Sequence, residues 1–146
     1  MGLFGNLISS FEPTFTIQQG IMTIVVAAVK ADGEVDDEEY YRVKSMCARS
    51  PVFAHNSAED DDALIKFADD MTHRLGVEQA IDKAGAALKM PQRETALAFA
   101  VDIVLADGIV SREEEAFIEM IVSKLGISGE VAQTVVSATI IRNRPA

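Results

Sequence analysis

The chain has 146 residues, enough for a domain whose core needs no metal or disulfide to hold it together. Hydrophobic residues make up 49% and charged residues 25%, which predicts a packed globular domain. Asp and Glu number 23 against 13 Lys and Arg, so the net charge is −10. So acidic a surface repels phosphate backbones and anionic lipids, which argues against nucleic-acid and membrane partners. A cation or a protein partner with a basic patch fits better, and self-association into a homo-oligomer stays open.

The sequence gives no sign of a secretory or membrane route. Residues 1–6 contain no basic stretch and no cleavage site, so they do not form a signal peptide. The longest apolar run, residues 24–29, is too short to span a bilayer. The single cysteine, Cys47, excludes an internal disulfide and suits a reducing compartment. We therefore expect a cytoplasmic protein with no inserted segment.

Apolar residues recur at helical spacing along almost the whole chain. Residues 17–31 are apolar on most sides, which predicts a central helix buried all round; a buried strand over 21–29 is the competing interpretation, although the segment is long for one. A second helix over 37–49 should end before Pro51. The same rhythm, with Gly76, Pro91 and Gly126 as boundary signals, predicts further helices over 64–75, 77–88, 91–104, 117–125 and 131–140. The fold class is all-α: one domain over residues 1–146, a bundle of about seven helices.

Two segments of the chain match at an offset of 75 residues. Residues 31–39 read ADGEVDDEE and residues 106–114 read ADGIVSREE. Each segment follows an apolar helix and precedes an amphipathic one, and the apolar positions on both sides also match. The halves 17–49 and 92–125 are therefore predicted to be two helix-loop-helix repeats. They should pack around a pseudo-two-fold axis, with the two apolar helices in the middle.

The residues of the repeated loop have a structural role that needs no ligand. Asp36 and Ser111 are good helix N-caps, and Glu39 and Glu114, three residues later, complete two capping boxes. The glycine of each Asp-Gly pair, Gly108 in the second copy, supplies a left-handed turn.

The same loops also resemble half of a calcium site. Asp-Gly-x-Val-x-x-x-Glu matches the second half of a calcium-binding loop, but the positions of the first two ligands are apolar or basic in both copies. Neither loop can surround a calcium ion alone. Two half-loops that face each other can pool Asp32, Glu39, Asp107 and Glu114 into one metal site. Hard cations such as Ca²⁺, Mg²⁺ or Mn²⁺ suit those oxygen ligands, and the capping role does not exclude this one.

Several other polar residues are expected to have structural roles. Asp102, within an apolar helix, is expected to face water or to pair with a base. Residues 59–62 are expected to be the solvated acidic start of a helix. Cys47 is expected to be a small core residue. No nucleophile with a neighbouring base and no glycine-rich phosphate loop is evident, so we do not expect an enzyme or an organic cofactor.

The doubled Ala-Asp-Gly-x-Val-[Asp/Ser]-x-x-Glu between helices resembles the TerB family of tellurite-resistance proteins, over residues 17–126. The resemblance implies an all-helical fold with two related halves and a role in tellurite resistance and bacterial stress response. It also implies divalent-cation binding by the acidic loop residues identified above. Two function classes remain: a cation-binding stress protein, and a non-enzymatic interaction module whose repeated loops are purely structural.

Overall fold

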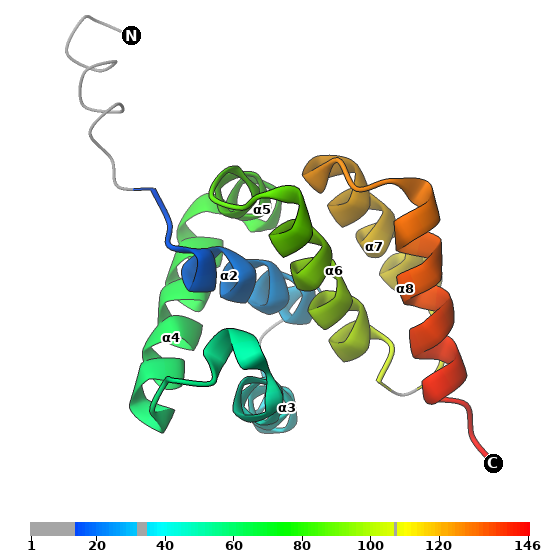
Figure 1. Cartoon of the computed structure of the whole chain (residues 1–146), viewed down its shortest axis with the longest axis horizontal. Helices are drawn as coiled ribbons and strands as arrows, with labels where there is room; N and C mark the ends of the chain where they lie inside the picture. Colours follow the sequence, from blue (N-terminus) through cyan, green and yellow to red (C-terminus); the bar gives the residue numbers. More distant parts are fainter. Residues whose placement is uncertain (1–13, 32–34, 107) are drawn as a thin grey trace, which may run out of the picture.

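The computed structural model describes residues 14–31, 35–106 and 108–146. Within these residues the chain forms seven α-helices and one short 3-10 helix, with no strand (Figure 1). The elements are α2 (Ile17–Lys30), α3 (Asp37–Arg49), η1 (Pro51–Phe53), α4 (Ala58–Leu75), α5 (Val77–Ala86), α6 (Met90–Val104), α7 (Arg112–Leu125) and α8 (Gly129–Arg142). The prediction of an all-α fold with about seven helices is therefore confirmed.

Helix α2 forms the centre of the bundle. Every residue from 20 to 29 is buried, and α4, α5 and α6 pack around the helix (Figure 1). Each fully buried aliphatic side chain contributes about 1.5–3 kcal/mol relative to exposure, so this helix is the largest single source of core stability. The alternative of a strand over residues 21–29 is wrong, because helices cover the segment on all sides and leave no neighbour with which a strand could pair.

Local sequence signals set the ends of most helices. The Thr16 hydroxyl accepts from the Gln19 amide at 3.1 Å, and the Gln19 side chain accepts from the Thr16 amide at 2.9 Å, which starts α2. Pro91 lies in the first turn of α6, where its missing N–H costs nothing. Gly76 and Gly126, both with positive φ, end α4 and α7. The boundaries predicted from these three residues are confirmed.

The second helix of each predicted repeat buries equivalent positions. Val43 and Met46 of α3 are buried, as are Ile118 and Ile121 of α7, their counterparts 75 residues on. Helix α7 packs on α5 and α6, whereas α3 packs on α4, α6 and η1. The burial pattern suits two related halves, and their superposition stays a prediction.

Gly108, in the second repeated segment, lies against the end of the last helix. Gly108 has φ +79°, the left-handed conformation expected from the sequence. A Cβ atom at this position would lie 2.7 Å from the carbonyl oxygen of Asn143, just after α8. Gly108 therefore meets two demands at once: a positive φ and a close backbone approach.

Gly108→Ala should destabilise the protein more than Gly126→Ala does. Gly126 is also left-handed, but an added Cβ there meets nothing within 4 Å, so its replacement costs only the conformational strain of about 1–2 kcal/mol. At Gly108 the contact with Asn143 should add about 1 kcal/mol or more. Urea denaturation of both variants measures the difference. Equal costs would show that the loop does not touch the end of α8 in solution.

Cys47 is a core residue, as the sequence predicted. Its side chain is 1% exposed, on the inner side of α3. Burial, followed by the negative charge of Asp61, raises the pKa of the Cys47 thiol to about 12. The thiol is therefore protonated and shielded at neutral pH, and it is a poor nucleophile.

Native Cys47 should react with a thiol reagent such as DTNB at pH 8 about 100-fold or more slowly than the chain unfolded in guanidinium. The free energy of unfolding should also fall as pH rises above 9, the ordinary pKa of the thiol, because the unfolded chain then binds fewer protons than the native one. Cys47→Ala should lack this part of the pH dependence. Equal reaction rates for native and unfolded protein would contradict the burial of Cys47.

Candidate functional site

The N-terminal ends of α3 and α7 carry the caps predicted for the repeated loop. Asp36 Oδ1 accepts from the Glu39 amide at 2.8 Å. Ser111 Oγ accepts from the Glu114 amide at 3.1 Å, and Glu114 Oε1 accepts from the Ser111 amide at 3.2 Å. The N-cap roles of Asp36 and Ser111 and the capping box at Ser111 are confirmed. Glu114 therefore has a structural function whether or not it binds an ion.

The predicted metal site is described only in part. Asp32 and Asp107 lie outside the described residues. Glu39 and Glu114 are both half-buried, unlike their exposed neighbours Glu38 and Glu113.

Glu39 and Glu114 line the same pocket, which we call the acidic pocket. It has a volume of about 200 Å³ and lies where the C-terminal ends of α2 and α6 meet the N-terminal ends of α3 and α7. Its lining consists of Ala28, Val29, Asp36, Glu38, Glu39, Arg42, Ile103, Val104 and Glu114. The structure thus brings together the two described members of the predicted set, although they are 75 residues apart in the chain.

Several lining residues of the acidic pocket are related by the 75-residue offset of the predicted repeat. Three pairs of its lining residues are separated by the same offset of 75 residues: Ala28 and Ile103, Val29 and Val104, Glu39 and Glu114. Two equivalent helix ends and two equivalent carboxylates therefore surround one space. This is the arrangement expected if the loops of the two halves face each other.

The charges around the acidic pocket are mostly negative. Four carboxylates and one guanidinium, that of Arg42, belong to its lining. Arg42 donates to Glu38 Oε1 at 3.0 Å, an exposed pair on one face of α3. Within the described part of the chain, no group of three or more Asp, Glu, His or Cys side chains is close enough to hold a metal ion. A site with three or more such side chains would need residues outside the described ranges, such as Asp32 or Asp107.

A larger hollow, which sequence analysis missed, lies on the other side of Arg42. This hollow, the arginine groove, has a volume of about 760 Å³ and runs between α3, η1, α6 and the C-terminal end of α8. It is lined by Arg42, Met46, Arg49, Ser50, Pro51, Val52, Thr95, Phe99, Asp102, Ile103, Ala106, Arg142 and Asn143. In Figure 1, α3 lies below α6 and the end of α8 lies to the right.

Three arginines surround an apolar lining in this groove. Arg142 forms an ion pair with Asp102, which confirms that Asp102 pairs with a base. Arg49 Nε donates to the Ser45 carbonyl at 3.3 Å, so the guanidinium keeps further donors. Arg42 and Arg49 are seven residues apart and so share a helix face, a signal present in the sequence. Only the packing of α3 against α6 shows that this face borders a groove.

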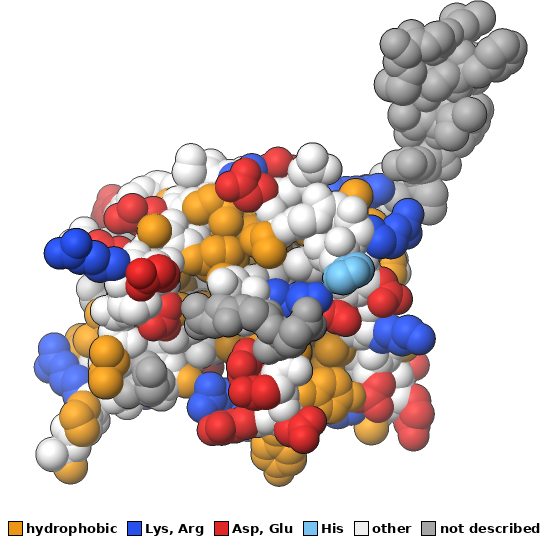
Figure 2. Space-filling model, turned by 180° about the vertical axis from the view of Figure 1, so that it is seen from behind, with side chains coloured by type: hydrophobic (Ala, Val, Ile, Leu, Met, Phe, Trp, Pro, Cys, Tyr) orange, Lys and Arg blue, Asp and Glu red, His pale blue; other side chains and the backbone are white. Residues whose placement is uncertain are grey.

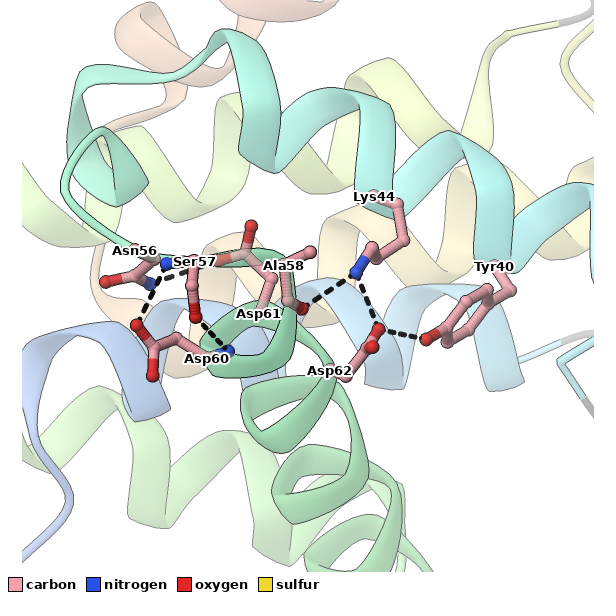
Figure 3. A network of polar contacts seen from close by, with 8 residues as sticks. All are labelled: Tyr40, Lys44, Asn56, Ser57, Ala58, Asp60, Asp61 and Asp62. Carbon is pink, nitrogen blue, oxygen red and sulfur yellow. Dashed lines mark hydrogen bonds and ion pairs between the residues drawn. The ribbon is translucent and has the colours of Figure 1, made fainter.

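A polar network joins α3 to the start of α4 (Figure 3). Lys44 donates to Asp62 at 2.6 Å and to the Ala58 carbonyl at 2.9 Å, and the Tyr40 hydroxyl also donates to Asp62. The bonds from Lys44 and then Tyr40 lower the pKa of the Asp62 carboxyl. The same bond to Asp62 raises the pKa of the Tyr40 hydroxyl. These groups satisfy one another, so the network connects two helices and offers no reactive group.

The prediction of a solvated acidic helix start is wrong for one residue. Ser57 and Asp60 cap α4, and residues 59, 60 and 62 are exposed, as expected. Asp61 is only 7% exposed and accepts from Asn56 Nδ2 at 3.0 Å. Asn56 in turn bonds to Gln18 of α2 at 3.2 Å. Asp61 is buried because α4 packs on α2 from its first turn, which the charge run alone did not reveal.

The comparisons with known proteins identify the family. No helix in the described parts of the chain combines the length and the apolar character needed to cross a membrane. We found no curated protein and no solved structure that matches the chain. The family described as "Tellurite resistance protein TerB" matches residues 18–135, which is most of the chain. With its all-helical fold and its doubled loop, the chain belongs to the TerB family.

Proposed function

We propose that this TerB-family protein serves tellurite resistance and stress response in the cytoplasm as a binding protein, not as an enzyme. Its ligand is a hard divalent cation, Ca²⁺, Mg²⁺ or Mn²⁺, held weakly at the acidic pocket. The observation that carries the proposal is that Glu39 and Glu114, from equivalent positions in the two halves, line one pocket. Family membership supports the biological role, and the pocket supports the ligand class.

The chemistry of the acidic pocket suits a hard cation. Its potential ligands are carboxylate oxygens, which Ca²⁺, Mg²⁺ and Mn²⁺ prefer. Glu114 uses Oε1 for its cap, and a carboxylate offers enough lone pairs to serve an amide and an ion together. Asp32 and Asp107 are the further ligands that the sequence predicts at this end of the bundle.

Three features keep the affinity low. The guanidinium of Arg42 is part of the pocket lining and opposes a cation. The C-terminal ends of α2 and α6 favour positive charge, but the N-terminal ends of α3 and α7 oppose it at the same place. Finally, both half-loops lack the first ligands of a full calcium loop. Binding in the millimolar range is the expected result.

The state of the reactive groups supports the proposal of a non-catalytic role. Cys47 is buried and its pKa is raised to about 12, so it does not act as a nucleophile. Asp62 and Tyr40 are held in a structural network with Lys44. Neither of the two hollows described above has a histidine in its lining.

A second candidate function is a protein-interaction module whose repeated loops only shape the fold. The arginine groove favours it, because a hollow of about 760 Å³ with an apolar lining and three arginines is larger than the acidic pocket. The two functions use different surfaces, so one protein can have both.

A cation at tenfold its dissociation constant should stabilise the native state by about 1.4 kcal/mol, which corresponds to a rise in Tm of about 3–6 °C. The measurement is thermal unfolding with about 10 mM Ca²⁺, Mg²⁺ or Mn²⁺, followed by calorimetric titration. This concentration is about tenfold a dissociation constant of about 1 mM. Glu39→Gln combined with Glu114→Gln should abolish the rise. Glutamine still completes a capping box, so this variant removes the charge and keeps the cap.

Two further variants separate the acidic pocket from general charge effects. Glu130→Gln removes a first-turn carboxylate from α8, outside the pocket, and should leave the rise in Tm unchanged. Asp32→Asn with Asp107→Asn tests the two positions outside the described residues and should also abolish it. No rise in the wild-type protein with any of the three cations would leave the interaction module as the function.

A further inference from the structure

The arginine groove is an exception on the surface of an acidic protein. The chain carries ten more acidic than basic side chains, and Figure 2 shows acidic side chains spread over the face seen from behind, among basic and hydrophobic ones. The groove lining instead contains three arginines and the carboxylate of Asp102, which pairs with Arg142. Arg42 pairs with Glu38 just outside the lining, so Arg49 supplies the excess positive charge, and both of these ion pairs are exposed. Arg42 and Arg49 are both exposed. A local excess of positive charge of this kind attracts an anionic partner and repels a basic one.

The positive charges are spread along the groove. Arg42 and Arg49 are separated by seven residues of α3, a rise of about 10 Å along the helix. Arg142, from the end of α8, adds a third position. One phosphate or carboxylate group cannot satisfy arginines placed so far apart. The spacing favours a ligand that carries several anionic groups along one chain.

The groove lining also contains apolar side chains that are held in place. Met46, Val52 and Phe99 contribute to it, and the Phe99 ring packs on the Phe53 ring with centroids 6.4 Å apart. Ring contact and core packing keep this surface formed without a ligand, which lowers the ordering cost of binding. Apolar side chains of a partner would bury surface here while its carboxylates pair with the arginines.

We infer that the arginine groove binds a short acidic peptide segment of a protein partner, with Leu- or Phe-like side chains between its carboxylates. The α6 side of the groove, from Thr95 to Ile103, is about 12 Å long, which matches about three to four residues of extended chain. This inference rests on the interaction-module function and adds its location and the chemistry of its ligand.

Charge complementarity favours a peptide over other polyanions. A nucleic acid or an anionic bilayer extends far beyond the groove and would meet the acidic surface around it. A short peptide segment occupies only the groove. It also supplies the apolar side chains that the lining requires.

The test is a selection of random 12-residue peptides displayed against the full-length protein. Enriched sequences should combine Asp or Glu with Leu or Phe, and their Kd values are then measured by fluorescence anisotropy. Arg49→Gln should raise Kd at least about fivefold, and Thr95→Glu, which places a negative charge in the groove, at least about tenfold. The matched control is Arg74→Gln, because Arg74 is exposed on α4 outside the groove. It should leave Kd unchanged.

Several outcomes would overturn the inference. They are a selection that yields no binder, binders without Asp or Glu, and binders with equal affinity for wild type and Arg49→Gln. Arginine-dependent binding of a single-stranded oligonucleotide or of phosphatidylglycerol vesicles, with no peptide bound, would also do so. Peptide binding that does not depend on Arg49 would support the interaction-module function but would place its binding site outside the arginine groove. Arg49 does not line the acidic pocket, so cation binding should be unchanged in Arg49→Gln. The test of peptide binding and the test of cation binding can therefore fail independently.

Discussion

The burial of α2 on all sides is the constraint on which the rest of the structure depends. A helix with no face toward water needs neighbours around its whole circumference, and α4, α5 and α6 supply them. The peripheral helices are then arranged by their contacts with this inner group. The buried hydroxyl of Thr23, within α2, has no hydrogen-bond partner among the described residues, a cost that the surrounding apolar contacts must offset.

The same packing brings the chemistry of the two loops together. Because the C-terminal ends of α2 and α6 lie close to each other, the helices that follow them begin around one space. Glu39 and Glu114 reach that space although each is placed by a local cap within its own half. Two segments that match in sequence thus contribute carboxylates to one pocket.

Arg42 links the two hollows of the molecule. It belongs to the lining of both the acidic pocket and the arginine groove, and it donates to Glu38 beside the pocket. The surface therefore has two regions of opposite charge a short distance apart along α3. Net charge describes only the average of such a surface, which is why an acidic protein can offer a binding region for an acidic partner.

The sequence by itself determined the helices, their ends and the caps of the repeated loop. These features depend on contacts within a few residues, such as the Ser111–Glu114 box and the positive φ of Gly108, and local chemistry decides them. The sequence also predicted that Cys47 lies in the core, because apolar residues that recur at helical spacing share one buried face of their helix. Tertiary structure alone decided that Glu39 and Glu114 share a pocket, that Asp61 is buried and that Arg42 and Arg49 border a groove. Those outcomes depend on which helix packs against which, and hydrophobic periodicity shows that a face is buried without naming the element that covers it.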